Sequence, residues 1–200
     1  MIRAVLFDFG GVLAEEGFRE GLNAIAKEKG LDPGDFYEIS SDLVYQTGYI
    51  TGGCDEHSYW NAVREKTGAK GDDQEFREEI LKRFKLRPEM TAVVKKIKSS
   101  GFIVAILSDQ TNWLDELNQR TPFHHRFDYV FNSFHLGKTK RDPSIFRDVC
   151  NLLGARPEEV LFVDDNLENV KRATSQGLKA IHFIGSREFQ IEIEKSVEMA

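Results

Sequence analysis

The sequence predicts an α/β protein in which an all-helical cap is inserted into a Rossmann-like core built on a parallel sheet. After residue 87, short apolar runs alternate with helical periodicity, a pattern typical of parallel strands covered by helices on both faces. Residues 15–86 instead show helical periodicity and no convincing strand. We therefore expect a core formed by residues 1–14 and 87–200, and a cap formed by residues 15–86.

The first strand is expected over residues 2–7, which are apolar and include β-branched side chains. In the cap, apolar residues recur at helical spacing, for example at Phe18, Leu22 and Ala26. Asp55 precedes another such stretch and is a favourable N-cap residue. The four expected cap helices lie near residues 18–26, 34–46, 55–67 and 76–84.

Helices and strands alternate through the rest of the chain. Asp142-Pro143 is a favourable helix start, because aspartate caps a helix and proline fits its first turn. The expected strands cover residues 102–107, 129–132, 160–163 and 179–183. The expected helices are one from Met90 that ends at Ser99-Ser100-Gly101, those over residues 112–120, 142–153 and 166–176, and a closing helix with Phe189, Ile193 and Val197.

Composition limits the classes of function. The chain has 200 residues and a net charge of −6, with scattered Lys and Arg, which argues against a nucleic-acid partner. No apolar stretch approaches the ~18–20 residues of a membrane span. Asp8 interrupts the N-terminal apolar run that a signal peptide would need. Cys54 and Cys150 make only a weak case for a disulfide, so we expect reduced thiols in a cytoplasmic setting. The expected assembly is a monomer or a homodimer.

Polar residues follow the apolar runs at four points. They are Asp8, the pair Ser108-Asp109, the pair Asp164-Asp165, and Lys138 and Lys140 in the loop after residue 132. Because the carboxyl ends of parallel strands meet at one edge of a sheet, we expect these residues to converge on one crevice. A cluster of Asp8, Asp164 and Asp165 would be too repulsive to stay ionised without a cation. Because carboxylates are hard oxygen ligands, the favoured cation is Mg²⁺. A lysine and a serine hydroxyl suit phosphoryl oxygens, and a carboxylate facing phosphorus can act as a nucleophile.

Four motifs, in order, resemble those of the haloacid dehalogenase (HAD) superfamily. They are Phe7-Asp8-Phe9-Gly10-Gly11-Val12-Leu13, Leu107-Ser108-Asp109-Gln110-Thr111, the segment around Lys140, and Phe162-Val163-Asp164-Asp165-Asn166-Leu167-Glu168-Asn169. The first motif is similar to the Asp-x-Gly-Gly/Asn-Val subgroup, which includes sugar-phosphate phosphatases and is similar to the phosphatase half of soluble epoxide hydrolases. The resemblance covers nearly the whole chain and implies the HAD fold with a helical type-1 cap.

The resemblance implies a role for each matching position. Asp8 would attack phosphorus and become phosphorylated. Ser108 and Lys140 would hold the phosphoryl oxygens. Asp109 would lie beside them at the substrate, and it stands where asparagine is common in the family. A small phosphorylated molecule is therefore the expected partner.

The implied Mg²⁺ ligands are Asp8, Asp164, Asp165 and the main-chain carbonyl of Gly10. The family usually has an aspartate at this last position, which protonates the leaving alcohol and then activates water. General acid–base catalysis of this kind typically raises the reaction rate by ~10²–10⁴-fold. We therefore expect slow turnover of alkyl phosphates, or a substrate with a better leaving group, such as a sugar 1-phosphate. The substitution Gly10→Asp is expected to raise turnover.

The leading prediction is a Mg²⁺-dependent phosphatase acting on a small metabolite, with an aspartyl-phosphate intermediate. One alternative is a metal-independent 2-haloacid dehalogenase, but such enzymes usually lack the acidic pair Asp164-Asp165. A second alternative is a catalytically weak protein that keeps the HAD scaffold and binds phosphate in a regulatory role.

Simpler interpretations stay open for single residues. Ser108 could only cap the next helix, and Lys140 could be a surface lysine, with Lys138 as a close neighbour. Tyr45, Gln46 and Tyr49 lie in the cap and could face the substrate, although a place in the cap core or on its surface is the simpler expectation. Trp60 and Trp113 are expected to serve packing.

Overall fold

The computed structural model describes residues 1–196, apart from the side chains of residues 194 and 195. Within them, five strands form one parallel sheet in the order β3-β2-β1-β4-β5, which confirms the predicted α/β class. The strands are β1 (Ala4–Phe7), β2 (Ile103–Ser108), β3 (Tyr129–Asn132), β4 (Val160–Asp164) and β5 (Lys179–His182). Each begins and ends within two residues of the predicted limits.

The register of the sheet aligns the strand ends. Phe7, the last residue of β1, pairs with Ile106 of β2 and with Val163 of β4. The main-chain N–H of Asp8 continues this ladder by donating to the carbonyl of Val163 at 2.8 Å. Asp8 therefore stands level with Asp164, and both residues lie at the same edge of the sheet.

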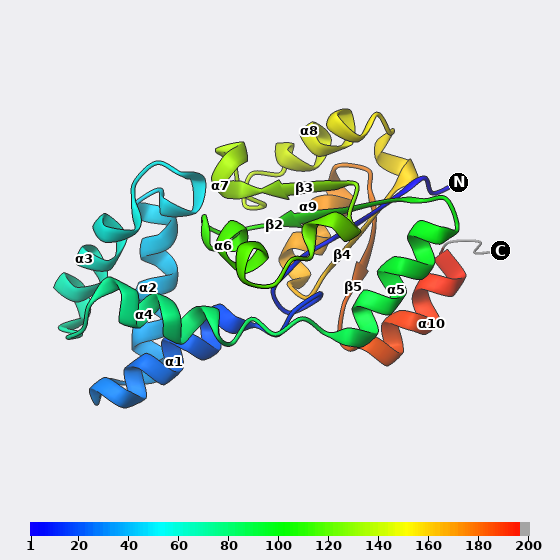
Figure 1. The fold of residues 1–200 in the computed structure, drawn as a ribbon. Helices are drawn as coiled ribbons and strands as arrows, with labels where there is room; N and C mark the ends of the chain where they lie inside the picture. Colours follow the sequence, from blue (N-terminus) through cyan, green and yellow to red (C-terminus); the bar gives the residue numbers. More distant parts are fainter. Residues whose placement is uncertain (197–200) are drawn as a thin grey trace.

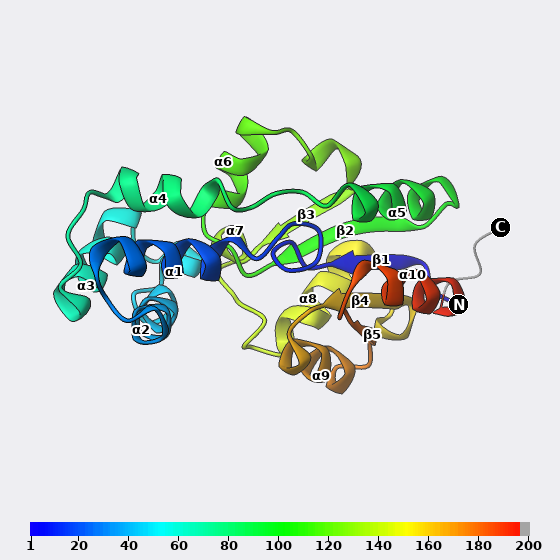
Figure 2. The same ribbon diagram turned by 90° about the horizontal axis from the view of Figure 1, so that it is seen from below.

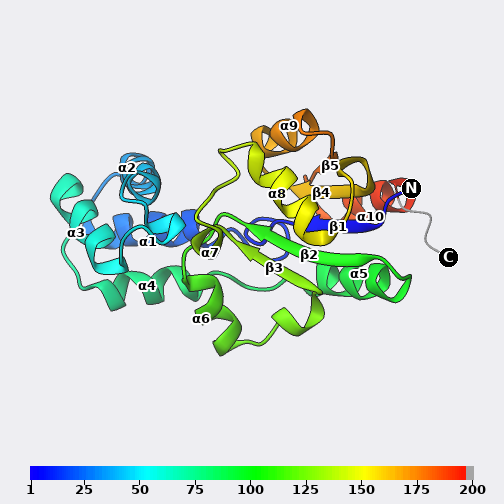
Figure 3. The same ribbon diagram turned by 90° about the horizontal axis from the view of Figure 1, so that it is seen from above.

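Helices cover both faces of the sheet. Along β1, Val5 and Phe7 face one side and Ala4 and Leu6 the other, because side chains alternate along a strand. The first face packs against α5 (Pro88–Ser99), α6 (Trp113–Arg120) and α10 (Ser186–Ser196), and the second against α8 (Ser144–Leu153) and α9 (Leu167–Ser175). Figures 2 and 3 show α8 and α9 on the side opposite α5. The predicted closing helix is α10, and Val197 lies outside the described residues.

Four helices lie beyond the carboxyl ends of the strands (Figure 1). They are α1 (Gly17–Lys29), α2 (Pro33–Gln46), α3 (Glu56–Thr67) and α4 (Asp73–Leu81), together called the helical group. The predicted N-cap of α3 is confirmed, because Asp55 accepts a hydrogen bond from the N–H of Ser58 at 2.8 Å. Asp32 and Asp72 cap α2 and α4 in the same way. The division into cap and core at residues 15 and 87 stays a prediction.

An aromatic cluster joins the helical group to the rest of the molecule. Trp60 of α3 and Trp113 of α6 are fully buried, and their ring centroids lie 6.0 Å apart. Tyr49, in the 3-10 helix η1 (Tyr49–Thr51), packs edge-on against Trp113. All three residues therefore serve packing, as predicted for the two tryptophans.

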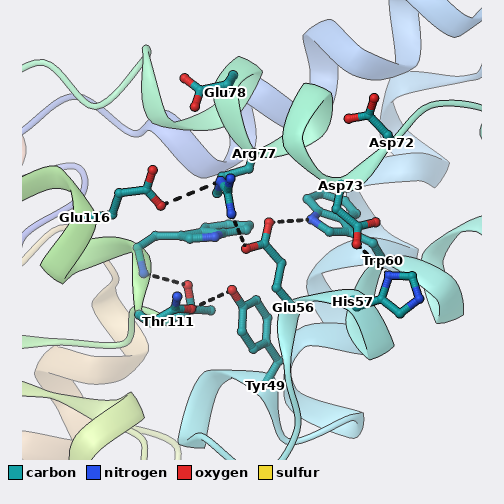
Figure 4. Close-up of polar contacts among 12 residues, drawn as sticks. Tyr49, Glu56, His57, Trp60, Asp72, Asp73, Arg77, Glu78, Thr111 and Glu116 are labelled. Atoms are coloured by element: carbon teal, nitrogen blue, oxygen red, sulfur yellow. Dashed lines mark hydrogen bonds and ion pairs between the residues drawn. The ribbon is translucent and has the colours of Figure 1, made fainter. Parts of the chain in front are cut away.

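Polar contacts surround this junction (Figure 4). Arg77 of α4 donates to Glu56 of α3 at 3.0 Å and lies 3.6 Å from a carboxylate oxygen of Glu116 on α6. The hydroxyl of Tyr49 donates to Asn112, at the start of α6, at 2.6 Å. Ionic contacts and hydrogen bonds, as well as the buried aromatic rings, thus connect the helical group to α6.

Some short elements differ from the prediction. Helix α8 begins at Ser144 rather than at residue 142, yet Asp142 still accepts hydrogen bonds from the N–H and the hydroxyl of Ser144. The sequence analysis missed α7 (Ser133–Leu136) and the 3-10 helices η1, η2 (His124–Arg126) and η3 (Pro157–Glu159), which are too short to show a period. Among the residues described, no helix combines the length and the apolar character needed to span a bilayer.

Candidate active site

Asp8, Lys140 and Asp164 form a buried ionic cluster at the carboxyl edge of the sheet. The Nζ of Lys140 lies 2.8 Å from Oδ1 of Asp8 and 2.7 Å from Oδ2 of Asp164. Lys140 is only 1% exposed and Asp164 is fully buried. A lysine is this deeply buried only where carboxylates compensate its charge. The sequence prediction that strand-end residues converge is therefore confirmed for these three.

The loop after β3 brings Lys140, and not Lys138, to the acids. The Nζ of Lys138 instead contacts Asp148 and donates to the hydroxyl of Ser144 at 2.9 Å, at the start of α8. The main-chain N–H of Lys140 donates to Oδ1 of Asp109 at 2.9 Å, which fixes the backbone at this point. The surface interpretation of Lys140 is thus wrong.

Ser108 and Asp109 leave the end of β2. Ser108 is 2% exposed and is not a capping residue, since α6 begins at Trp113 with Asn112 at its N-cap position. The carboxylate of Asp109 accepts hydrogen bonds from the hydroxyls of Ser133 at 2.7 Å and Tyr45 at 3.4 Å, besides the N–H of Lys140. Asp109 therefore connects three segments of the chain, a role that the sequence analysis did not anticipate.

Asp164 is held in one orientation by α9. Its Oδ1 accepts from the main-chain N–H of Asn166 at 2.7 Å, and the side-chain amide of Asn169 donates to both carboxylate oxygens at 3.2–3.3 Å. The sequence analysis gave Asn169 no role. Its position, three residues after the N-cap Asn166 and therefore on the first turn facing Asp164, is the signal that could have revealed it.

Burial and neighbouring charge set the protonation of this cluster. Burial raises the pKa of Asp8 well above its ordinary value, the charges of Asp164 and Asp165 raise it further, and Lys140 opposes the shift. Burial alone would lower the pKa of Lys140, but the carboxylates of Asp164 and Asp8 hold it above its ordinary value. Lys140 therefore stays cationic. Its single charge does not fully compensate the burial of Asp8 and the repulsion from the two other carboxylates.

The same carboxylates could hold a cation. Oxygens of Asp8, Asp164 and Asp165 all lie within 4.8 Å of one another. They face the single ammonium group of Lys140, so the fully ionised cluster carries two uncompensated negative charges. A small divalent cation matches both this charge and the oxygen donor set. The residues present therefore fit Mg²⁺.

Gly11 allows Asp165 to approach the loop after β1. Its φ is +80°, and a Cβ there would overlap the carboxylate of Asp165. We expect Gly11→Ala to cost the ~1–2 kcal/mol of left-handed backbone and to displace the exposed carboxylate of Asp165. The matched control is Gly30→Ala, where φ is +69° and no atom lies within 4 Å. Denaturant unfolding with and without Mg²⁺ checks this: Gly11→Ala should gain less stability from Mg²⁺ than Gly30→Ala does, and an equal gain would contradict the displacement.

A cavity of about 800 Å³ opens over the acids, between the sheet edge and the helical group. Asp8, Ser108, Asp109, Lys140 and Asp165 line one wall. Arg19 and Arg141 also line the cavity. The guanidinium of Arg19 lies 4.4 Å from the ring of Tyr37, and that of Arg141 lies 3.4 Å from the ring of Tyr45. Tyr45 thus lines the cavity rather than the interior of the helical group. The cavity thus brings the carboxylate of Asp8 together with cationic side chains and further acids. The cationic side chains are Arg19, Lys140, Arg141 and Arg172, and the acids are Glu16, Asp109, Asp165 and Glu168.

The family model of haloacid dehalogenase-like hydrolases matches residues 2–175. The chain belongs to this family. The HAD-like fold, the hydrolase class and the resemblance stated from the four motifs are thereby confirmed. The match spans both the helical group and most of the sheet, including all the residues that converge at its carboxyl edge.

Curated relatives include both phosphatases and a dehalogenase. The chain is 26% identical to mouse bifunctional epoxide hydrolase 2 over 97% of its length, but it spans only 38% of that protein. It is 28% identical to phosphoserine phosphatase of Thermus thermophilus, covering 90% of this chain and 80% of that one. It is 35% identical to (S)-2-haloacid dehalogenase 4A of Burkholderia cepacia, covering 47% of this chain and 41% of the relative.

Among solved structures, an HAD family enzyme of Bacteroides thetaiotaomicron in complex with magnesium and inorganic phosphate is similar to this chain. The TM-score is 0.71 at 20% identity, and the match covers 90% of this chain and 93% of that one. This likeness shows the fold.

Proposed function

We propose that this HAD-like hydrolase is a Mg²⁺-dependent phosphatase that hydrolyses a small phosphorylated metabolite through an aspartyl-phosphate on Asp8. The observation that carries the proposal is the buried Lys140, which reaches both Asp8 and Asp164 at the floor of the cavity. A fixed cation beside a nucleophilic carboxylate suits a substrate that brings its own negative charge to that point.

Each residue has a distinct part in this proposal. Asp8 attacks phosphorus and forms the acyl phosphate, while the bond from phosphorus to the leaving oxygen breaks. Lys140 and Ser108 hold the non-bridging oxygens of the phosphoryl group. Asp109 positions Lys140 through its main-chain N–H. Water then attacks the phosphorus of the aspartyl-phosphate, which releases phosphate and restores Asp8.

Asp8, Asp164, Asp165 and the carbonyl of Gly10 would hold Mg²⁺. When bound, Mg²⁺ supplies charge that offsets the repulsion between the acids and the phosphoryl group. The acidic cluster within 4.8 Å supports this part of the proposal. The Bacteroides structure, whose fold is similar, is a complex with magnesium and inorganic phosphate.

The cavity supports a substrate of metabolite size, such as a sugar phosphate. Its volume of about 800 Å³ lies in the range typical of small-molecule sites. Arg19 and Arg141 on the wall of the cavity favour polar or anionic groups on the part of the substrate that remains after phosphate is removed. The helical group would exclude water around the bound substrate.

A 2-haloacid dehalogenase is the second candidate, because the chain resembles one such enzyme over about half its length. The resemblance of the active-site residues favours the phosphatase, since the acidic pair of Asp164 and Asp165 suits a cation that haloacid chemistry does not require. A catalytically weak protein that binds phosphate is the third.

A screen of phosphorylated metabolites with and without Mg²⁺ separates these candidates. We expect EDTA to abolish hydrolysis and added Mg²⁺ to restore it, because the acids would otherwise repel the phosphoryl group. The readout is released phosphate, with 2-chloropropionate and chloride release as the parallel assay. Chloride release that survives EDTA would overturn the phosphatase, and binding of phosphate without turnover on any substrate would favour the regulatory candidate.

A further inference from the structure

Gly10 has no side chain at the position where the first motif of the family usually carries an aspartate. A Cβ built on Gly10 would have only two neighbours within 4 Å: Cε1 of Phe84 at 3.3 Å and Oε1 of Glu16 at 3.9 Å. The carboxylate of Glu16 therefore points at the space that an acidic side chain on residue 10 would enter. Glu16 also lines the cavity that holds Asp8 and Lys140.

The loop after β1 brings Glu16 back to Gly10. The main-chain N–H groups of Leu13 and Ala14 both donate to the carbonyl of Phe9 at 2.9 Å, which folds the loop tightly. Ala14 then bridges to Gly10 on one side and to Leu86 on the other. Glu16 follows two residues later, so its return to the site is built into the backbone.

The start of α1 fixes the direction of the Glu16 side chain. Glu16 is the N-cap residue, and its Oε2 accepts a hydrogen bond from the N–H of Arg19 at 2.7 Å. The other oxygen, Oε1, faces Gly10. Glu16 does not belong to the carboxylate group that converges within 4.8 Å in the described residues, so it is available for a task other than cation binding.

The surroundings of Glu16 favour its protonated form. Burial raises its pKa above the ordinary value, and the nearby charge of Asp165 adds to this, whereas the N–H of Arg19 opposes it. A carboxyl group whose pKa is raised keeps its proton to higher pH and can then donate it in a reaction.

On this geometry we propose that Glu16 is the general acid and base of the phosphatase, taking the place of the acid that Gly10 lacks. The inference rests on the proposed function. As Asp8 bonds to phosphorus, the bond to the leaving oxygen breaks and the Glu16 proton moves to that oxygen, which leaves as an alcohol. In the second half, the Glu16 carboxylate accepts a proton from water as the water oxygen bonds to phosphorus, and Asp8 departs as a carboxylate.

The test is the dependence of kcat/KM on the leaving group, with phenyl phosphate and p-nitrophenyl phosphate as substrates in the presence of Mg²⁺. We expect Glu16→Gln to lower kcat/KM for phenyl phosphate by ~10²–10⁴-fold. Phenol is a weak acid, so its oxygen is a poor leaving group unless it is protonated as the bond to phosphorus breaks. For p-nitrophenyl phosphate, whose leaving group is a stable anion, we expect a loss below about tenfold. Glutamine keeps an oxygen that can accept from the N–H of Arg19, so the cap of α1 is preserved.

Two further variants sharpen the test. Glu20→Gln removes the same charge from an exposed side chain in the first turn of α1 and is expected to leave both rates unchanged. Gly10→Asp in the Glu16→Gln background is expected to recover phenyl phosphate hydrolysis, and to do so by a larger factor than Gly10→Asp achieves alone. Phe84 has to shift by only a few tenths of an ångström to admit the Cβ of the new residue.

If Glu16→Gln lowers kcat/KM equally for both substrates, or does not lower it, Glu16 is not the general acid, but the proposed phosphatase activity is unaffected. Hydrolysis in the wild type that does not depend on Asp8, or no hydrolysis at all, would instead contradict the proposed function and this inference together.

Discussion

Replacing Asp8 with asparagine is expected to lower phosphate release by at least about 10³-fold, because the amide cannot form the acyl phosphate. The shape of the side chain is kept. Released phosphate with the best substrate of the screen is the measurement, and Asp42→Asn, an exposed position on α2, is the control. Activity within about tenfold of the wild type would rule out Asp8 as the nucleophile.

The same variant should not be less stable in metal-free buffer. Since burial raises the pKa of Asp8 in the folded protein, its ionised form works against folding as the pH rises past the unfolded pKa. Asparagine carries no such charge. Loss of activity with stability kept or increased is the signature of a residue retained for chemistry rather than for folding.

Replacing Lys140 with methionine is expected to reduce the free energy of unfolding by about 3–5 kcal/mol at neutral pH, because two buried carboxylates lose their counter-charge. Lys138→Met is the matched control. That lysine pairs with Asp148 at the surface, and its loss should cost at most about 1 kcal/mol. Denaturant unfolding measures both.

The loss of unfolding free energy in the Lys140→Met variant should become smaller as the pH falls. Without the ammonium group, the pKa of Asp8 rises further in the folded state, so the folded protein binds more protons than the unfolded one and loses stability as the pH rises. Protonation at low pH removes the repulsion. Added Mg²⁺ should restore part of the stability at neutral pH, because it binds the folded cluster and not the unfolded chain. A deficit that is independent of both pH and Mg²⁺ would show that Lys140 acts through packing alone.

The sequence predicted the sheet and the acids at its edge because both depend on local pattern. A short apolar run that ends at an acid marks a buried strand and its exit, so Asp8 and Asp164 were found together with β1 and β4. Parallel register then forced them to meet. Four cap helices were equally visible, since each shows several turns of apolar repeat.

The rest depends on tertiary contacts that leave no local pattern. Nothing in the spacing tells which of Lys138 and Lys140 points inward, because that depends on the N–H of Lys140 meeting Asp109. Glu16 was missed for a related reason. It precedes an amphipathic helix, where a capping acid is ordinary, and only the tight loop after β1 returns it to Gly10.

The stacked indoles described at the junction give the protein an optical reporter of its own. Trp60 and Trp113 are the only tryptophans in the chain, and they face each other 6.0 Å apart, one on α3 and the other on α6. All intrinsic tryptophan fluorescence therefore originates where the helical group meets the sheet-bearing part. A ligand that moves these parts relative to each other will change the emission wavelength and intensity without any attached dye, so opening and closing of the cavity can be followed in the unmodified protein.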